Sequence, residues 1–216
     1  PASATNIQID GVAPIITSVT NPASIITYIA GDKVPVVINY DDNVTVDITG
    51  GTPSIDIMLS DSGQTVSAVY ISGTGTSALT FEYTVVIGNE DTDGIVTAGT
   101  IALNSGTLKD ASGNNADLTI DGAADPASAT NIRVDAIAPI ITSVTNPGSL
   151  TNYISGETVT VTINYDEAVV VDTTNGTPSL NILLESGGPE TANYSGGSGT
   201  TAISFQFTCL LYTNNG

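Results

Sequence analysis

The sequence lacks several kinds of residue, and each absence excludes a kind of site or segment. It contains no histidine and no tryptophan, and its only cysteine is Cys209. A single cysteine cannot form a disulfide within the chain or a thiolate cluster. No run of apolar residues reaches the roughly 18–20 that a membrane-spanning helix requires. No signal peptide is visible, and the chain starts at Pro1 without a methionine, so we expect a mature or excised piece.

Positive charge is almost absent. Lys33, Lys109 and Arg133 are the only cations, and the net charge is −19. Such a polyanion is repelled by nucleic-acid phosphates and by anionic membrane surfaces, which excludes nucleic-acid partners and direct membrane insertion. The charge serves solubility, or it indicates that a small cation binds.

Lysine, arginine and glutamate are also scarce, whereas glycine, serine, threonine, asparagine and aspartate abound. This composition favours short strands joined by tight turns and disfavours helices. A length of 216 residues is sufficient for two domains, each with its own core.

A long internal repeat is the strongest feature of the sequence. Residues 126–150 match residues 1–25 at 19 of 25 positions, at a spacing of 125. The match continues from 39–55 to 164–180 and, after the loss of one residue, from 70–84 to 194–208. A period above 100 residues predicts separate domains in series rather than a solenoid of small repeats.

Apolar residues alternate with polar ones inside both copies. One face of a predicted strand carries Val34, Val36, Ile38 and Tyr40, matched in the second copy by Val159, Val161, Ile163 and Tyr165. Pro35, on the other face, suggests an edge strand. A second face carries Leu79, Phe81, Tyr83, Val85 and Ile87, matched by Ile203, Phe205, Phe207, Cys209 and Leu211. Period-2 alternation at this spacing predicts an all-β protein of tandem immunoglobulin-like β-sandwich domains, with Cys209 as a small buried hydrophobe.

The repeat also predicts the domain boundaries. One domain spans 11–135, and a second spans 136–216 but lacks a counterpart of roughly the last third of the first. Residues 1–10 match residues 126–135, the predicted closing strand of the first domain, and we expect them to be an orphan terminal strand. The ending "CLLYTNNG" departs from the repeat, so we expect a true terminus there.

Three segments carry a family resemblance: "VTVDITGGTPSI" (44–55), "LTFEYTVVIGNEDTDGI" (79–95) and "IALNSGTLKDASGNNADL" (101–118). Their order resembles the immunoglobulin-like repeats of large bacterial surface adhesins, over 11–135 and the matching part of 136–208. The resemblance implies an extracellular structural or adhesive module, often stiffened by calcium, without catalysis. Two departures stand out: the acidic loop begins Gly88-Asn89 rather than Gly-Asp, and the second copy ends "LLYTNNG" in its place.

The best candidate metal site is "NEDTDG" (89–94). Asn89, Asp91 and Asp93 alternate before Gly94, as in the first half of a calcium-binding loop. The glutamate of an EF-hand is absent, because Thr100 stands in its place. The segment predicts a calcium site in a loop of the sandwich, or else a solvated acidic turn.

Two further acidic groups are candidates for calcium. The first is repeated in both copies: Asp41, Asp42 and Asp47, then Asp166, Glu167 and Asp172. Carboxylates this close repel one another unless a cation neutralises them, although they could equally point into water from opposite faces. The second group contains Asp110 and Asn114, where side-chain turns on the local backbone are the competing interpretation.

Other chemistry is poorly supported. A glycosidase needs paired carboxyls in a cleft with aromatic platforms, and aromatic residues are only 5% of this chain, so we predict no enzyme. A Lys–Asn isopeptide bond is disfavoured because Thr158 replaces Lys33 in the second copy. Three sequons, at Asn43, Asn175 and Asn193, permit glycosylation without indicating it.

Two functions remain open, both structural and both extracellular or at the cell surface. In the favoured one, the chain is a filament subunit: its first strand inserts into the incomplete second domain of a neighbouring copy, giving a head-to-tail helical homopolymer. The assembly residues are then Ala4, Thr5, Asn6, Ile7, Gln8, Ile9 and Asp10, with Ile7 and Ile9 facing one way. In the alternative, the chain is a segment of a covalent, calcium-stiffened adhesin stalk. Against the filament, ten residues do not replace the missing third, unless that third forms dispensable hairpins.

Overall fold

We describe the fold from a computed structural model, which covers residues 9–97, 99–120, 128–146, 152–184 and 188–210. The chain divides into two compact units, Pro1–Ile137 (unit 1) and Ala138–Gly216 (unit 2), and each is described by itself. The residues covered form strands and turns but no helix, which confirms the all-β prediction. Within them there is accordingly no helix long and apolar enough to cross a membrane.

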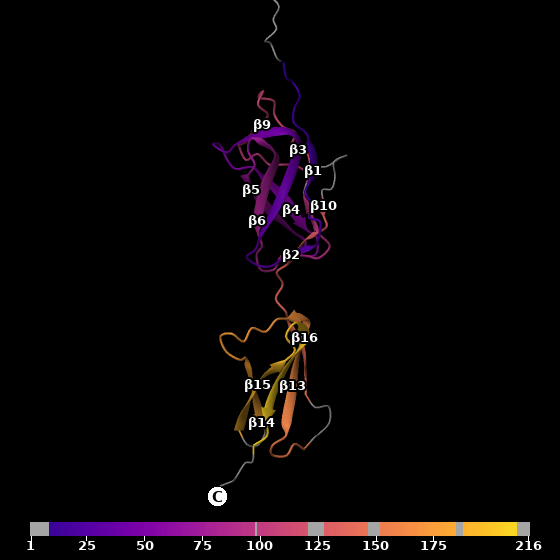
Figure 1. The fold of residues 1–216 in the computed structure, drawn as a ribbon, viewed down its shortest axis with the longest axis vertical. Helices are drawn as coiled ribbons and strands as arrows, with labels where there is room; N and C mark the ends of the chain where they lie inside the picture. The colour runs from indigo at the N-terminus through magenta and orange to yellow at the C-terminus, as the bar shows by residue number, and fades with distance from the viewer. Residues whose placement is uncertain (1–8, 98, 121–127, 147–151, 185–187, 211–216) are drawn as a thin grey trace, which may run out of the picture. The chain divides into compact units, whose positions relative to one another are not determined.

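Unit 1 is built from two sheets (Figure 1). Its strands are β1 (Ile16–Val19), β2 (Ile26–Tyr28), β3 (Lys33–Asp47), β4 (Ser54–Leu59), β5 (Gln64–Ser72), β6 (Thr76–Thr84), β7 (Glu90–Asp91), β8 (Ile95–Thr97), β9 (Thr107–Lys109), β10 (Ser128–Ala129) and β11 (Ile132–Asp135). The larger sheet has the order β1-β3-β6-β5-β4-β8-β10, with β9 paired to β3, and the smaller sheet has the order β2-β11-β7. All pairs are antiparallel except β11 with β2, which run parallel.

The core of unit 1 follows the predicted alternation. Val34, Val36 and Ile38 of β3 are fully buried, as are Leu79 and Phe81 of β6, which pairs with β3 along most of its length. Side chains on one face of a strand point the same way, so the two strands bury one common apolar surface. Burying each of these side chains stabilises the fold by about 1.5–3 kcal/mol.

Two details of this prediction are wrong. Ile87 is 83% exposed, because β6 ends at Thr84 and the chain has already turned away from the core. The strand that contains Pro35 is not at an edge, since β3 lies between β1 and β6. However, β1 pairs with β3 only from Ile38 to Tyr40, so Pro35 lies where β3 has no β1 partner and its missing N–H costs nothing.

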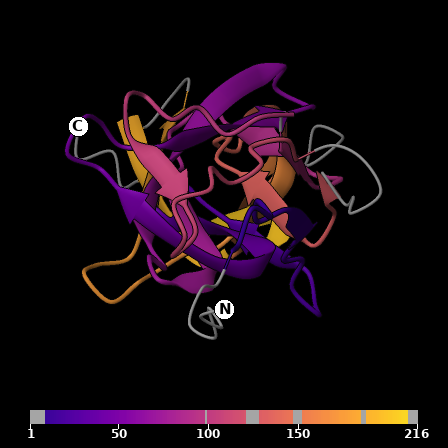
Figure 2. The same cartoon turned by 90° about the horizontal axis from the view of Figure 1, so that it is seen from above.

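The second half of unit 1 closes the core. Residues from β8, β9, β11 and the loops between them are buried against β3, β4 and β6; they include Ile95, Ile101, Leu108, Ile132 and Val134. Seen from above, the strands of unit 1 curl around this common centre (Figure 2).

Unit 2 repeats the first five-strand part of this arrangement. Its strands are β12 (Ile141–Thr145), β13 (Thr158–Val169), β14 (Ser179–Leu184), β15 (Gly188–Gly196) and β16 (Thr200–Thr208). They form one antiparallel sheet of order β12-β13-β16-β15-β14, which matches β1-β3-β6-β5-β4 of unit 1 strand for strand. The tyrosine–phenylalanine edge contact between neighbouring strands is also repeated, at Tyr70–Phe81 and Tyr194–Phe205.

Candidate functional site

The acidic loop 89–94 is folded around two buried polar side chains. Asn89 is fully buried; its Oδ1 accepts the N–H of Val86 at 2.9 Å, and its Nδ2 donates to Oε1 of Gln64 at 2.6 Å. The first predicted calcium ligand is therefore engaged in closing the turn after β6.

Asp91 is also fully buried and accepts hydrogen bonds on both oxygens. Its Oδ2 accepts the N–H of Ser60 at 2.7 Å and the Ser60 hydroxyl at 3.3 Å, and its Oδ1 accepts the N–H of Gly94 at 2.7 Å. Burial raises the pKa of Tyr83, and the negative charge of Asp91 raises it further. Protein donors thus satisfy a carboxylate that would otherwise be costly to bury.

Asp93 is exposed and approaches the same serine. Its Oδ1 accepts the Ser60 hydroxyl at 3.0 Å, while Oδ2 of Asp61 accepts the N–H and the hydroxyl of Thr92, each at 2.6 Å. Both hydrogen bonds from Thr92 lower the pKa of Asp61, and the one from its side chain has the larger effect. Hydrogen bonds therefore join the turn after β4 to the acidic loop. Sequence reasoning missed Ser60, Asp61 and Gln64 because they lie about 30 residues before the loop in sequence.

The second group of predicted ligands does not converge in the first copy. Asp41 accepts the N–H of Ile15 at 2.8 Å, and Asp42 accepts that of Asn43 at 2.7 Å. Asp47 accepts hydrogen bonds from the hydroxyl and the N–H of Thr49. Both bonds lower the pKa of Asp47, and the one from the hydroxyl has the larger effect.

The same arrangement recurs in unit 2. Asp166 accepts the N–H of Ile140 at 2.9 Å. Asp172 accepts the hydroxyl and the N–H of Thr174, and these bonds lower the pKa of Asp172. Glu167 is half-buried in β13. Asp41 and Asp166 therefore each bind the backbone of another strand region, whereas Asp47 and Asp172 each bind the backbone two residues ahead.

Asp110 and Asn114 form a side-chain turn. Oδ1 of Asp110 accepts the N–H groups of Ser112 and Asn114 at 2.9 and 2.8 Å, and its Oδ2 accepts Nδ2 of Asn114 at 2.7 Å. Desolvation by itself raises the pKa of Asp110, but the hydrogen bonds from Asn114, Ser112 and Gly113 together lower it. Nδ2 of Asn114 also reaches the carbonyl of Val12 at 3.2 Å, which ties this turn to the start of unit 1.

Across the residues covered, no three or more of the His, Cys, Asp and Glu side chains are grouped so that they could hold a metal ion. Calcium binding at 89–94, or at the other acidic groups, stays a prediction. The three sequon residues, Asn43, Asn175 and Asn193, all have exposed side chains.

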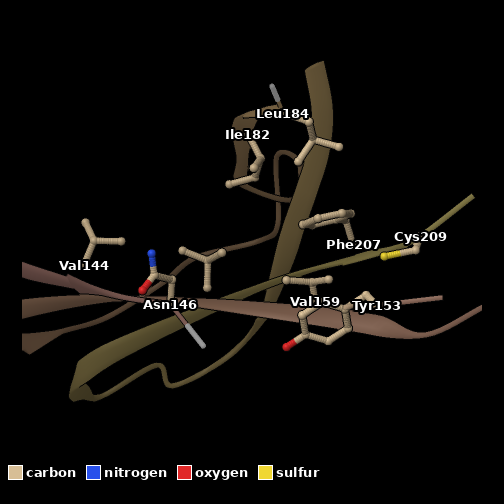
Figure 3. A pocket seen from close by; sticks show the side chains of 9 residues that line it. Val144, Asn146, Tyr153, Val159, Ile182, Leu184, Phe207 and Cys209 are labelled. Carbon is tan, nitrogen blue, oxygen red and sulfur yellow. The ribbon is translucent and has the colours of Figure 1, made fainter. Parts of the chain in front are cut away.

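The most distinctive surface is an apolar pocket on the sheet of unit 2 (Figure 3). It has a volume of about 430 Å³, and its walls include Val144, Tyr153, Ile182, Leu184, Phe207 and Cys209. Cys209 is only partly buried, whereas Val85 at the equivalent position of unit 1 is 1% exposed. The prediction of a buried Cys209 is therefore wrong, because the side chains that cover Val85 have no counterpart among the residues covered in unit 2.

Matched positions show how open this face is. Val144 is 55% exposed and Leu184 is 41% exposed, whereas their counterparts Val19 and Leu59 in unit 1 are 5% and 1% exposed. The side chains are the same in both copies, so the difference lies in what covers them. In unit 1, Val19 and Leu59 belong to one buried core together with Ile132 and Val134 of β11.

The predicted assembly strand lies mostly outside the residues covered, which include Ile9 and Asp10 but not Ala4, Thr5, Asn6, Ile7 and Gln8. Ile9 is 92% exposed. The Asp10 carboxylate accepts the Ser112 hydroxyl at 2.9 Å and the N–H of Val12 at 3.1 Å.

No protein-family model and no curated protein matches this sequence.

Proposed function

We propose that this chain is a structural protein of an extracellular bacterial surface filament, built from immunoglobulin-like β-sandwich domains in series. The observation that carries the proposal is the duplicated fold: units 1 and 2 share a strand order and a sequence pattern, and unit 1 closes its own apolar core. Such units in series make a long spacer, which needs no catalytic site.

Copies of the chain join head to tail in this proposal. Side chains exposed on the apolar face of unit 2 have counterparts in unit 1 that share one buried core with β11. Residues 1–10 match residues 126–135, which contain β10 and β11, at eight of ten positions. A strand donated by a neighbouring copy would bury this apolar face. Because the donor and the acceptor are different surfaces of one chain, the contact propagates into a filament unless it closes a ring.

A covalent stalk is the second candidate, and one observation favours it. Unit 1 is closed by more than β11, because Ile95, Ile101 and Leu108 also lie in its core. A ten-residue strand carries no counterpart of these three side chains. In a covalent array, each unit would be completed by residues of its own repeat.

Electron microscopy of the purified chain, before and after removal of residues 1–10, tests the proposal. Regular filaments that disappear on trimming support head-to-tail assembly. Isolated particles, indifferent to trimming, contradict it and leave the covalent stalk. A matched control is the full chain with Ile7→Asp and Ile9→Asp, which keeps the length of the segment but removes its apolar face.

A further inference from the structure

A polar clasp fixes the start of β11 in unit 1. Oδ1 of Asn21 accepts the N–H of Asn131 at 3.1 Å, and Nδ2 of Asn21 donates to the Thr130 hydroxyl at 3.2 Å. The carbonyl of Asn131 then accepts the N–H of Ile26 at 2.8 Å. These bonds set the register in which β11 pairs with β2, and they aim Ile132 and Val134 into the core.

The three side chains of this clasp, those of Asn21, Thr130 and Asn131, have identical counterparts elsewhere in the chain. The repeat places Asn146 of unit 2 where unit 1 has Asn21, and it places Thr5 and Asn6 where unit 1 has Thr130 and Asn131. Asn146 lines the apolar pocket of unit 2 (Figure 3). Unit 2 therefore carries the counterpart of Asn21, and residues 1–10 carry the counterparts of Thr130 and Asn131.

The apolar residues correspond as well. Ile7 stands where β11 has Ile132, and Ile9 stands where it has Val134. Val134 pairs with Tyr28 of β2, and the counterpart of Tyr28 is Tyr153, which lines the same pocket. In the register of β11 on β2, Gln8 aligns with Asn152 and Ile9 aligns with Tyr153.

We infer that residues 1–10 of a second copy bind the apolar face of unit 2 in the register of β11, with Thr5 and Asn6 on Asn146 and with Ile7 and Ile9 in the pocket. This inference rests on the proposed function and adds the position and register at which the incoming strand binds, which we call its seat. The strand runs parallel to the segment at Tyr153, as β11 runs parallel to β2. Asn146 sets the register, and the apolar pocket provides the buried area.

A cysteine cross-link tests the seat directly, because the only native cysteine, Cys209, lines the pocket. Ile9→Cys places a second thiol on the side chain that enters the pocket, and Gln8→Cys places it one residue earlier, on the opposite face of the strand. Under mild oxidation we expect Ile9→Cys to give a ladder of covalent multimers at least tenfold faster than Gln8→Cys. The unaltered chain, with one thiol per copy, stops at dimers. Equal rates for the two variants would overturn the seat.

The clasp has its own matched pair of variants, Asn146→Ala and Asn21→Ala. The probe is a fluorescent peptide of sequence PASATNIQID, titrated with the full-length chain. We expect Asn146→Ala to weaken peptide binding about tenfold, as for the loss of about one net hydrogen bond, while Asn21→Ala leaves binding unchanged and lowers the melting temperature of unit 1. Circular dichroism checks that each variant is folded. Unchanged binding by a folded Asn146→Ala variant removes Asn146 from the contact.

The seat and the proposed function fail separately. Filaments that require residues 1–10 but show no preference for the Ile9→Cys cross-link place the joint elsewhere and leave the filament intact. Chains that neither assemble nor bind the peptide contradict the filament itself.

Discussion

At the scale of single residues, the acidic side chains of this protein act mainly on its own backbone. Asp41 and Asp166 each fasten the N–H of an isoleucine 26 positions earlier, at matching places in the two copies. Asp91 is the buried extreme of the same behaviour, with backbone donors on both oxygens. A negative charge spread in this way organises loops, whether or not a cation also binds.

Removing the Asp91 carboxylate should destabilise unit 1 even without calcium. Asp91→Ala removes the acceptor of the buried Gly94 N–H, at about 1–3 kcal/mol, and of the Ser60 N–H, at an exposed residue where water can replace part of the lost bond. Asp93→Ala, at an exposed side chain that accepts the Ser60 hydroxyl, should cost less than about 1 kcal/mol. Denaturant unfolding in calcium and in EDTA measures both. A loss that appears only in calcium would show that the loop is held by the ion and not by these hydrogen bonds.

The hydrogen bonds to Asp110 predict a loss of stability in acid. They hold the pKa of Asp110 below its ordinary value near 3.9, so the stability they provide is present above that pH. It is lost as the pH falls through the lowered pKa of the folded state and the carboxyl takes up a proton. The melting temperature of unit 1 should therefore fall less steeply below about pH 4 in Asp110→Asn than in the unaltered chain. The exposed Asp56→Asn is the charge-matched control, and it should leave the slope unchanged.

At the scale of elements, the entry to β8 is shaped by the close approach of the chain before β11. Gly94 has a φ of +116°, and a Cβ there would lie 2.3 Å from the Cα of Thr130. Gly88 has a similar φ of +92°, but a Cβ there would meet nothing within 4 Å. Alanine at Gly88 would therefore meet backbone strain alone, whereas alanine at Gly94 would meet both backbone strain and a steric clash.

Gly94→Ala should destabilise unit 1 more than Gly88→Ala. In both variants, an alanine at positive φ should lower the free energy of unfolding by about 1–2 kcal/mol. Gly94→Ala should lower it by about a further 1–3 kcal/mol, because the backbone at Thr130 must move. Urea unfolding, followed by circular dichroism, gives the difference. Equal losses for the two alanines would mean that the chain at Thr130 yields freely.

The elements also show what the sequence predicts and what it does not. The alternation in β3 and β6 identifies Val34, Ile38 and Phe81 as core residues, because period 2 follows directly from strand geometry. It fails at Ile87, since a pattern of side chains does not record where pairing stops. The parallel pairing of β11 with β2 joins residues more than 100 positions apart and has no local signal.

The candidate sites were predicted unevenly for the same reason. Asn89 and Asp91 could be singled out from their own spacing, but their partners Gln64 and Ser60 lie in another turn that only the fold brings near. Cys209 shows the opposite case: its strand position was predictable, but its exposure depends on cover that local sequence does not describe.

At the scale of the whole molecule, the two units should differ in stability. Ile16 of unit 1 is 7% exposed, whereas its counterpart Ile141 is 59% exposed, so unit 2 buries less apolar surface per strand. We expect two thermal transitions in calorimetry, with unit 2 unfolding first. Leu79→Ala should move only the later transition and Ile203→Ala only the earlier one, each losing about 2–5 kcal/mol. A single transition moved by both variants would contradict independent units.

The parallel pairing of β11 with β2 has a mechanical consequence. When the two ends of unit 1 are pulled apart, the force on β2 acts toward the N-terminus and the force on β11 acts toward the C-terminus. Because these two strands run in the same direction, they are drawn past each other, and the hydrogen bonds from Ile26–Ile132 to Tyr28–Val134 are strained together rather than opened one at a time. A unit joined in this way resists tension through bonds that must break almost at once.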